Sequence, residues 1–123
     1  MEQKVCLDTD VVIAILNNEE RAVKAVEKIG NGNVFITTIT LFELLLRKTN
    51  LQAIEIFRNK VYVLDFNEEA ARKASDIFKE LQNKGRMTDI RDVFIASICI
   101  ANGGSLSTFN KKHFEHIKEI SLI

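Results

Sequence analysis

Short apolar runs alternate along the chain with longer segments in which apolar residues recur at helical spacing. The runs are rich in β-branched and other large apolar residues and end at polar or glycine-rich turns, a pattern that predicts buried strands. Strands are expected over residues 5–7, 34–36, 61–64 and 105–108, and a last apolar run covers 120–123.

Amphipathic segments between these strands predict helices. The first begins after Thr9 or Asp10, either of which can cap it, is interrupted at Asn17 and Asn18, and continues over 19–29. Further helices are expected over 37–48, 51–58, 68–84 and 89–101. Because strands and helices alternate, the strands are joined by crossovers and pair in parallel. The pattern therefore predicts an α/β fold in which helices cover both faces of a parallel sheet.

Composition narrows the class of protein. The chain has 123 residues, the size of one domain, with 46% hydrophobic and 28% charged residues and 17 basic residues balancing 17 acidic ones. This composition excludes intrinsic disorder, and zero net charge argues against a broad, non-specific coat for nucleic acid. We therefore expect a single globular domain over residues 1–123.

Three further features bear on where the protein acts. The longest apolar run, residues 11–16, is too short to span a membrane. The first residues lead into the first strand without the layout of a signal peptide. Cys6 and Cys99 lie in apolar runs, which predicts buried, reduced thiols rather than a disulfide framework. Together these features predict a cytoplasmic protein that does not insert into a membrane.

Polar side chains from separate segments converge on one edge of the predicted sheet. Asp8 follows the first strand, Glu43 lies on the helix after the second strand, and Asn110 follows the fourth. Asp89 and Asp92 are three residues apart in the first turn of a helix and therefore share a face. Because open α/β sheets bind ligands beyond the carboxyl ends of their strands, we expect these side chains to form a site.

Each acid also has a simpler structural interpretation. Glu43 can pair with Arg47, one helical turn away. Asp89 can cap its helix with Asp92 at the third position, where the helix dipole favours both. A convergent cluster is costly without a cation, because carboxylates about 4 Å apart repel by about 4 kcal/mol at an effective dielectric of 20. An all-oxygen set of ligands suits Mg²⁺ or Mn²⁺.

The expected chemistry is phosphodiester hydrolysis, because Mg²⁺ held by few carboxylates keeps positions open for water and phosphate oxygens. A zinc site is not expected, since His113 and His116 lack a third histidine or a cysteine nearby in sequence. Cationic side chains near the same edge can contact a nucleic-acid backbone. They are Arg47, Lys48, Arg86, Arg91, Lys111, Lys112 and His113.

The ordered motifs of the chain resemble the PIN domain, and within it the VapC-like toxin ribonucleases. The matching pieces are VCLDTD at residues 5–10 and TTITLFEL at 37–44. The most specific piece is TDIRDVFIA at 88–96, which continues through NGG to LSTFNKKHF at 106–114. The resemblance covers nearly the whole chain, in order and at matching spacing.

The resemblance implies a three-layer α/β/α fold with a parallel sheet of four to five strands. It also implies a Mg²⁺- or Mn²⁺-dependent endoribonuclease that cleaves single-stranded RNA, and it maps the family's acids to Asp8, Glu43 and Asp92. The family's fourth position, an aspartate or asparagine, is Asn110. Its neutral side chain makes Asp89 a candidate additional metal ligand. A VapB-like antitoxin in the active-site groove and a homodimer are implied as partners.

Other functions remain open within the same fold class. The family also contains RNA-processing nucleases, and a catalytically silent PIN-like binding module would keep the fold without cleaving RNA. A phospho-acceptor receiver would use Asp65, at the end of the third strand, as its acceptor. That alternative needs paired acids at the end of the first strand, where Asp8 and Asp10 flank Thr9, and it assigns no role to Glu43 or Asp92.

Overall fold

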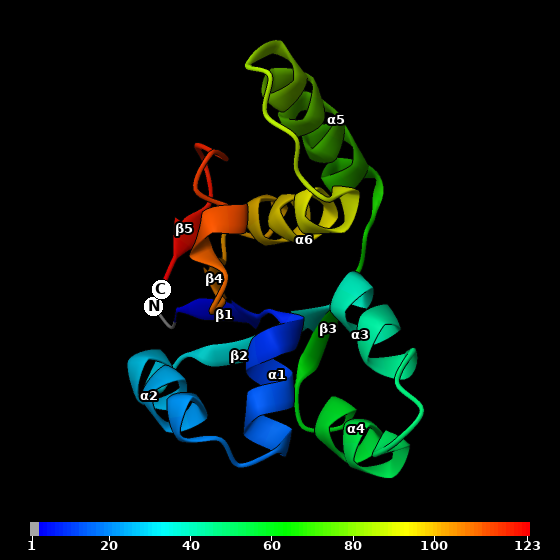
Figure 1. Ribbon diagram of the computed structural model, residues 1–123, viewed down its shortest axis with the longest axis vertical. Coiled ribbons are helices and arrows are strands. Elements are labelled where there is room, and N and C mark those ends of the chain that lie inside the picture. Colours follow the sequence, from blue (N-terminus) through cyan, green and yellow to red (C-terminus); the bar gives the residue numbers. More distant parts are fainter. Residues whose placement is uncertain (1–2) are drawn as a thin grey trace.

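The computed structural model describes residues 3–123 as a parallel sheet between layers of helices (Figure 1). The strands are β1 (Lys4–Leu7), β2 (Asn33–Thr37), β3 (Tyr62–Leu64), β4 (Ser105–Ser107) and β5 (Ser121–Leu122). The helices are α1 (Thr9–Leu16), α2 (Glu20–Ile29), α3 (Thr38–Leu45), α4 (Leu51–Arg58), α5 (Glu68–Asn83) and α6 (Ile90–Ala101), followed by the 3₁₀ turn η1 (Lys111–His113). Met1 and Glu2, where no signal peptide is expected, lie outside the described residues.

The sheet has five strands in the order β3-β2-β1-β4-β5, and every neighbouring pair is parallel. The chain adds β2 and β3 on one side of β1, then returns through α5 and α6 and adds β4 and β5 on the other side. The direction of winding therefore reverses between β1 and β4, where Leu7 pairs with Ser107. In α/β sheets such a switch point opens a crevice at the carboxyl ends of the two strands.

Side chains of β1 alternate between two cores, one on each face of the sheet. Val5 and Leu7 pack in one core with buried residues of α1, α2, α3 and α4, including Ile54. Cys6 packs in the other with residues of α5 and α6, including Cys99, and both cysteines are buried free thiols. In Figure 1, α5 and α6 accordingly lie on the opposite side of the strands from α1, α2 and α4. The predicted three-layer α/β/α architecture is confirmed.

The predicted order of elements is also confirmed, with shifts at some boundaries. Helix α1 begins at Thr9, so its N-cap is Asp8 rather than Thr9 or Asp10, because β1 leads into α1 through that single residue. Helix α3 ends at Leu45 and not near residue 48, because Asn50 takes a left-handed backbone conformation (φ 61°) that turns the chain into α4. Within residues 3–123, no helix is long and apolar enough to cross a membrane.

Candidate active site

The site lies at the switch point, where β1 and β4 end side by side. The backbone N–H of Asp8 donates to the Ser107 carbonyl at 2.9 Å, which extends the strand pairing by one residue beyond β1. Asp8 then caps α1 and is only 7% exposed. The sheet and the helix together therefore hold this carboxylate in a rigid, buried position.

Two threonines hold the Asp8 carboxylate. Its Oδ2 accepts a hydrogen bond from the Thr108 hydroxyl at 2.7 Å, and its Oδ1 accepts one from the Thr9 N–H at 2.9 Å. Burial raises the pKa of Asp8 above its usual value. The hydrogen bond from Thr108 opposes this rise, whereas the charge of Asp10 increases the rise. Both oxygens keep a lone pair for a further ligand.

Glu43 reaches the same site from α3. Its Oε1 accepts a hydrogen bond from the Thr9 hydroxyl at 2.8 Å, and its Oε2 lies 3.5 Å from Arg91 Nη1 on α6. The structure thus pairs Glu43 with Arg91 between two helices, rather than with Arg47 along its own helix. Since Thr9 also donates to Asp8, this one residue joins the Asp8 and Glu43 carboxylates in a single network.

Asp92, in the first turn of α6, is the point at which the acids converge. Burial raises its pKa to about 6, and the charges of Asp8, Asp89 and Glu43 each contribute to the rise. His113 Nδ1 lies 3.4 Å from Asp92 Oδ2, and this neighbour opposes the rise in the pKa of Asp92. A carboxylate with these neighbours changes its charge close to neutral pH.

Asp89 caps α6, as one of its two predicted interpretations requires. Its Oδ1 accepts a hydrogen bond from the Arg91 N–H at 2.9 Å, and its Oδ2 lies 3.2 Å from Arg91 Nη2. The hydrogen bonds with the Arg91 side chain and then with its backbone lower the pKa of Asp89. Arg91 is therefore the counter-charge of both Asp89 and Glu43.

Asn110 follows β4 and is held by Asp10, a residue that the sequence predicts as a candidate helix cap. Asp10 Oδ2 accepts hydrogen bonds from the Phe109 N–H and from Asn110 Nδ2, each at 3.1 Å. Asp10 Oδ1 is buried without a hydrogen-bond partner, and burial raises the pKa of this carboxyl group. Asp10 thus fixes the turn that presents Asn110. Its only signal in the sequence is a second acid two residues after Asp8.

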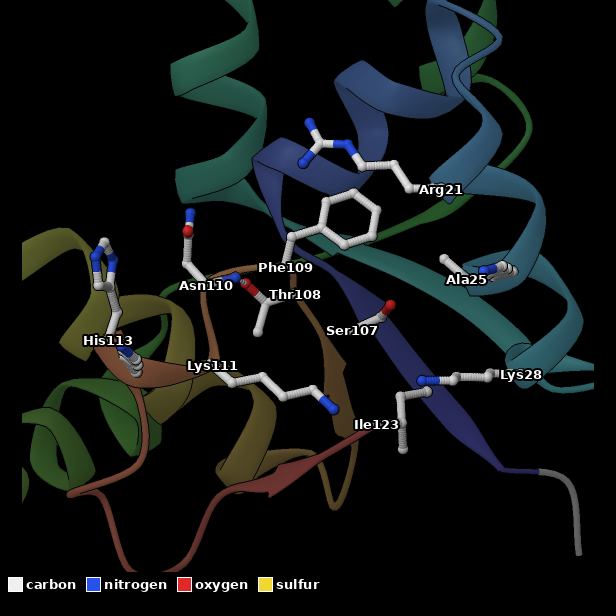
Figure 2. Close-up of a pocket in the computed structure, with 12 residues that line it drawn as sticks. Arg21, Ala25, Lys28, Ser107, Thr108, Phe109, Asn110, Lys111, His113 and Ile123 are labelled. Carbon is white, nitrogen blue, oxygen red and sulfur yellow. Dashed lines mark hydrogen bonds between the residues drawn. The ribbon is translucent and has the colours of Figure 1, made fainter.

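Cavities flank the carboxylates on two sides. One, of about 580 Å³, lies between α2, β4 and η1 (Figure 2). The other, of about 520 Å³, is lined by Arg86, Asp89 and Asp92. Lys112 and His113 line both cavities, whereas Arg47 and Lys48 lie in the connection after α3 and line neither cavity.

The donor chemistry of the centre fits a hard divalent cation. Asp8, Glu43 and Asp92 supply carboxylate oxygens, and a cation would relieve the repulsion that raises the pKa of Asp92. In the described part of the chain, no three acidic, histidine or cysteine side chains are grouped closely enough to hold a metal ion in their present rotamers. A cation bound by Glu43 would compete with Arg91 for the Oε2 atom of that carboxylate.

Comparison with known protein families matches residues 5–120 to the PIN domain. The chain belongs to the PIN domain family. Ribonuclease VapC1 of Methanocaldococcus jannaschii is 29% identical to this PIN domain over 98% of this chain and 86% of the relative. The tRNA(fMet)-specific endonuclease VapC of Shigella flexneri is 30% identical over 93% of this chain and 92% of the relative.

Solved structures show the same fold. The crystal structure of DNA-bound VapBC from Salmonella typhimurium matches this PIN domain with a TM-score of 0.86 and 29% identity, over 98% of this chain and 97% of that one. VapBC2 from Rickettsia felis, bound to a promoter DNA fragment, matches with a TM-score of 0.84 over 98% of each chain, and its 23% identity supports the fold alone.

The resemblance to VapC-like PIN domains is therefore confirmed, and the receiver alternative is set aside. Asp65 follows the edge strand β3, is exposed, and is separated from β1 by β2. The structure brings Asp8, Glu43, Asp92 and Asn110 to one edge of the sheet. Their catalytic and metal-binding roles, and that of Asp89 as a ligand, remain predictions.

Replacing Asp89 by alanine should lower the free energy of unfolding by about 1 kcal/mol, because the Arg91 N–H loses its cap. Asp89→Asn, which still offers an oxygen to that N–H, should keep most of the stability. Urea unfolding measures both variants, and calorimetric titration with Mn²⁺ is the control. Wild-type stability of the alanine variant together with lost Mn²⁺ binding would instead make Asp89 a metal ligand.

The stability of the metal-free protein should depend on the ionisation of Asp92. Because its pKa is raised in the folded state to about 6, Asp92 stabilises the fold when protonated, and this contribution is lost as the pH rises from about 4 through 6. Asp92→Asn should therefore unfold at about the wild-type free energy at pH 4.5 and be about 1–2 kcal/mol more stable at pH 7.5. Denaturant titrations in EDTA measure the difference, and a gap that does not vary with pH would contradict the expectation.

Asp10 should determine the rigidity of the turn after β4. In Asp10→Ala the Phe109 N–H loses its acceptor, so its amide hydrogen should exchange with solvent faster than in the wild-type protein. Asp10→Asn keeps an acceptor oxygen and should preserve the protection of Phe109. Hydrogen exchange followed by NMR makes the comparison, with the Asp8 N–H, which pairs with Ser107, as the internal control. Equal Phe109 protection in all three proteins would show that other contacts hold the turn.

Proposed function

We propose that this PIN domain is a Mg²⁺- or Mn²⁺-dependent endoribonuclease that cleaves single-stranded RNA as the toxin of a toxin–antitoxin pair. The observation that carries the proposal is the convergence of Asp8, Glu43 and Asp92 at the switch point of a PIN fold. The matched relatives are named as a ribonuclease and a tRNA endonuclease, and these names support RNA cleavage as the reaction class. Residues 1–123 would form this one catalytic domain.

Each acidic residue of the site would have its own role in hydrolysis. Asp8, Glu43 and Asp92 would hold the divalent ion, which when bound supplies an acidified water and neutralises phosphate charge. Asp8 is fixed by Thr108 and Thr9, so it cannot turn away from the phosphate. Asp92 would share the ion with Asp8 and Glu43, and the bound cation would offset the repulsion that raises the pKa of this group in the metal-free protein.

Asn110 would orient the RNA rather than hold charge. One of its two amide hydrogens is engaged by Asp10, and the exposed side chain keeps the other for a phosphate oxygen. His113, beside Asp92, is placed to contact the same phosphate. The neutral Asn110 makes the centre less negative than an aspartate would, which favours the approach of an anionic backbone.

We further propose a VapB-like antitoxin as partner, which would bind across the active-site groove, and a homodimer as the assembled state. The structural neighbour from Salmonella typhimurium, which is described as VapBC, supports the first. Exposed apolar side chains on α3, namely Phe42 and Leu45, with Leu46 after it, support the second, since they form an uncovered patch of surface. The cytoplasm remains the predicted location, because the proposed substrate is cellular RNA.

Purified protein should cleave a labelled pool of single-stranded RNA in the presence of Mn²⁺ or Mg²⁺ and lose that activity in EDTA. Asp8→Asn and Asp92→Asn should each lower the cleavage rate by at least about 100-fold, because each removes a carboxylate from the reacting centre. Asp65→Asn is the matched control, since it also removes an aspartate that follows a strand, but at the far edge of the sheet. Circular dichroism confirms that each variant folds.

Each alternative gives a different result in this assay. If the folded, antitoxin-free protein leaves every RNA intact with either ion, it is a PIN-like binding module and the proposed activity is wrong. Wild-type cleavage by Asp8→Asn or Asp92→Asn would remove that residue from the mechanism. Loss of activity in Asp65→Asn would contradict the location of the site at the switch point.

A further inference from the structure

One face of α2 carries a row of basic side chains. Arg21, Lys24 and Lys28 are three and four residues apart, so they project from the same side of the helix. Together with Lys111 and Lys112 of η1 they line the cavity of about 580 Å³ between α2 and β4. Figure 2 shows Lys28 and Lys111 reaching toward one another across it, near Ile123. We call these five cations and the cavity between them the basic groove.

The charge of the basic groove is not balanced locally. None of the residues that line it is an aspartate or a glutamate. Lys24, Lys28, Lys111 and Lys112 are all exposed, and within residues 3–123 none of them forms an ion pair. The whole chain has a formal net charge of zero, so this excess of positive charge belongs to one surface and not to the protein as a whole.

Arg21 differs from the lysines because it is already held. Its Nε lies 2.9 Å from Glu19 Oε1, and its guanidinium lies 4.3 Å from the centre of the Phe109 ring. Phe109 is in turn held by Asp10 through its backbone N–H. These contacts tie α2 to the turn after β4, so the basic groove keeps a fixed position relative to Asn110 and Asp8.

The basic groove lies next to the carboxylate centre, because Thr108 and His113 line the groove and also contact Asp8 and Asp92. Thr108, which binds Asp8, and Asn110 and His113 line the end of the groove nearest the acids, while Lys28 and Ile123 lie toward the other end. A strand whose phosphate sits at Asp8 and Asp92 would pass the turn at Asn110 to enter the groove. Ala25, Phe109 and Ile123 add apolar surface for the sugars and bases between the phosphates.

We propose that the basic groove binds the phosphate backbone of single-stranded RNA on one side of the bond that is cut. The inference rests on the proposed function for its substrate, and it adds α2, which no local motif marks, to the RNA-binding surface. Four lysines that form no ion pair within residues 3–123, with no aspartate or glutamate among the lining residues, match a chain of phosphates. Such contacts hold RNA of any sequence, so the groove contributes affinity and not base specificity.

Salt-dependent binding of RNA in EDTA tests the groove without requiring cleavage. The probe is a fluorescein-labelled single-stranded RNA decamer, titrated by anisotropy between about 50 and 200 mM KCl, the range in which phosphate contacts change affinity strongly. The variant Lys24→Gln/Lys28→Gln should lower the magnitude of the slope of log K against log [KCl] by about 1.4, because each phosphate contact on a single strand contributes about 0.7.

The matched control is Lys60→Gln/Lys79→Gln, which removes the same charge from exposed positions after α4 and on α5, outside the groove. Its slope should equal that of the wild-type protein. With Mn²⁺ present, the groove variant should raise KM and leave kcat unchanged, because the lysines bind substrate and transition state alike.

The outcomes separate this inference from the proposed function. Equal slopes in the two double variants would overturn the proposal that the groove binds RNA, even if the protein cleaves RNA. A reduced slope in the groove variant alone supports the groove, even if the wild-type protein cleaves nothing and the proposed function fails. If the groove variant instead loses binding of a fluorescent polyglutamate peptide while its RNA slope is unchanged, the surface binds acidic protein and the proposal is overturned.

Discussion

A buried carboxylate at the end of the central strand is the constraint on which the rest of this site depends. Asp8 is carried to the switch point by the pairing of β1 with β4, and its backbone continues that pairing through Ser107. Burial of a carboxylate is costly unless hydrogen bonds or a cation compensate for it. The surrounding residues provide this compensation through Thr108 and Thr9, both of which donate to Asp8.

The same requirement explains the arrangement of the other charges. Glu43, Asp89 and Asp92 add negative charge around Asp8, and Arg91 and His113 lie against them. Arg91 is shared by two of these acids and reaches them by its own long side chain, so it can withdraw without a change in the backbone. Arg91 and His113 therefore offset only part of the negative charge, and the raised pKa of Asp92 reflects burial and the repulsion that is left.

Charge is separated over a short distance on a protein that is neutral overall. The acids lie at the carboxyl ends of β1 and at the start of α6, while the cations lie on α2 and η1, on the far side of the turn that contains Asn110. Asp10 connects these regions. It lies in the first turn of α1, near Asp8, and accepts a hydrogen bond from the backbone N–H of Phe109, and the Arg21 guanidinium lies over the Phe109 ring. A single surface thus combines reacting carboxylates with an anion-binding groove.

Local signals in the sequence determined the secondary structure and the segments from which the acids come. Apolar runs and helical spacing predicted the order of strands and helices, and the alternation predicted a parallel sheet with Asp8, Glu43 and Asp92 at one edge. Those patterns depend on neighbours within a few residues, so they can be read without the fold. They erred by a residue or more where a turn set the boundary, as at Asn50.

Only the tertiary structure decided which groups meet. Glu43 has Arg47 one turn away, yet it pairs with Arg91, because α3 packs against α6 and the Arg91 side chain reaches the Glu43 carboxylate. Asp10 looked like a helix cap until β4 closed beside β1 and placed Phe109 against it. The row of cations on α2 faces the site for the same reason. Contacts between residues far apart in the chain depend on how the sheet closes, and no local pattern records them.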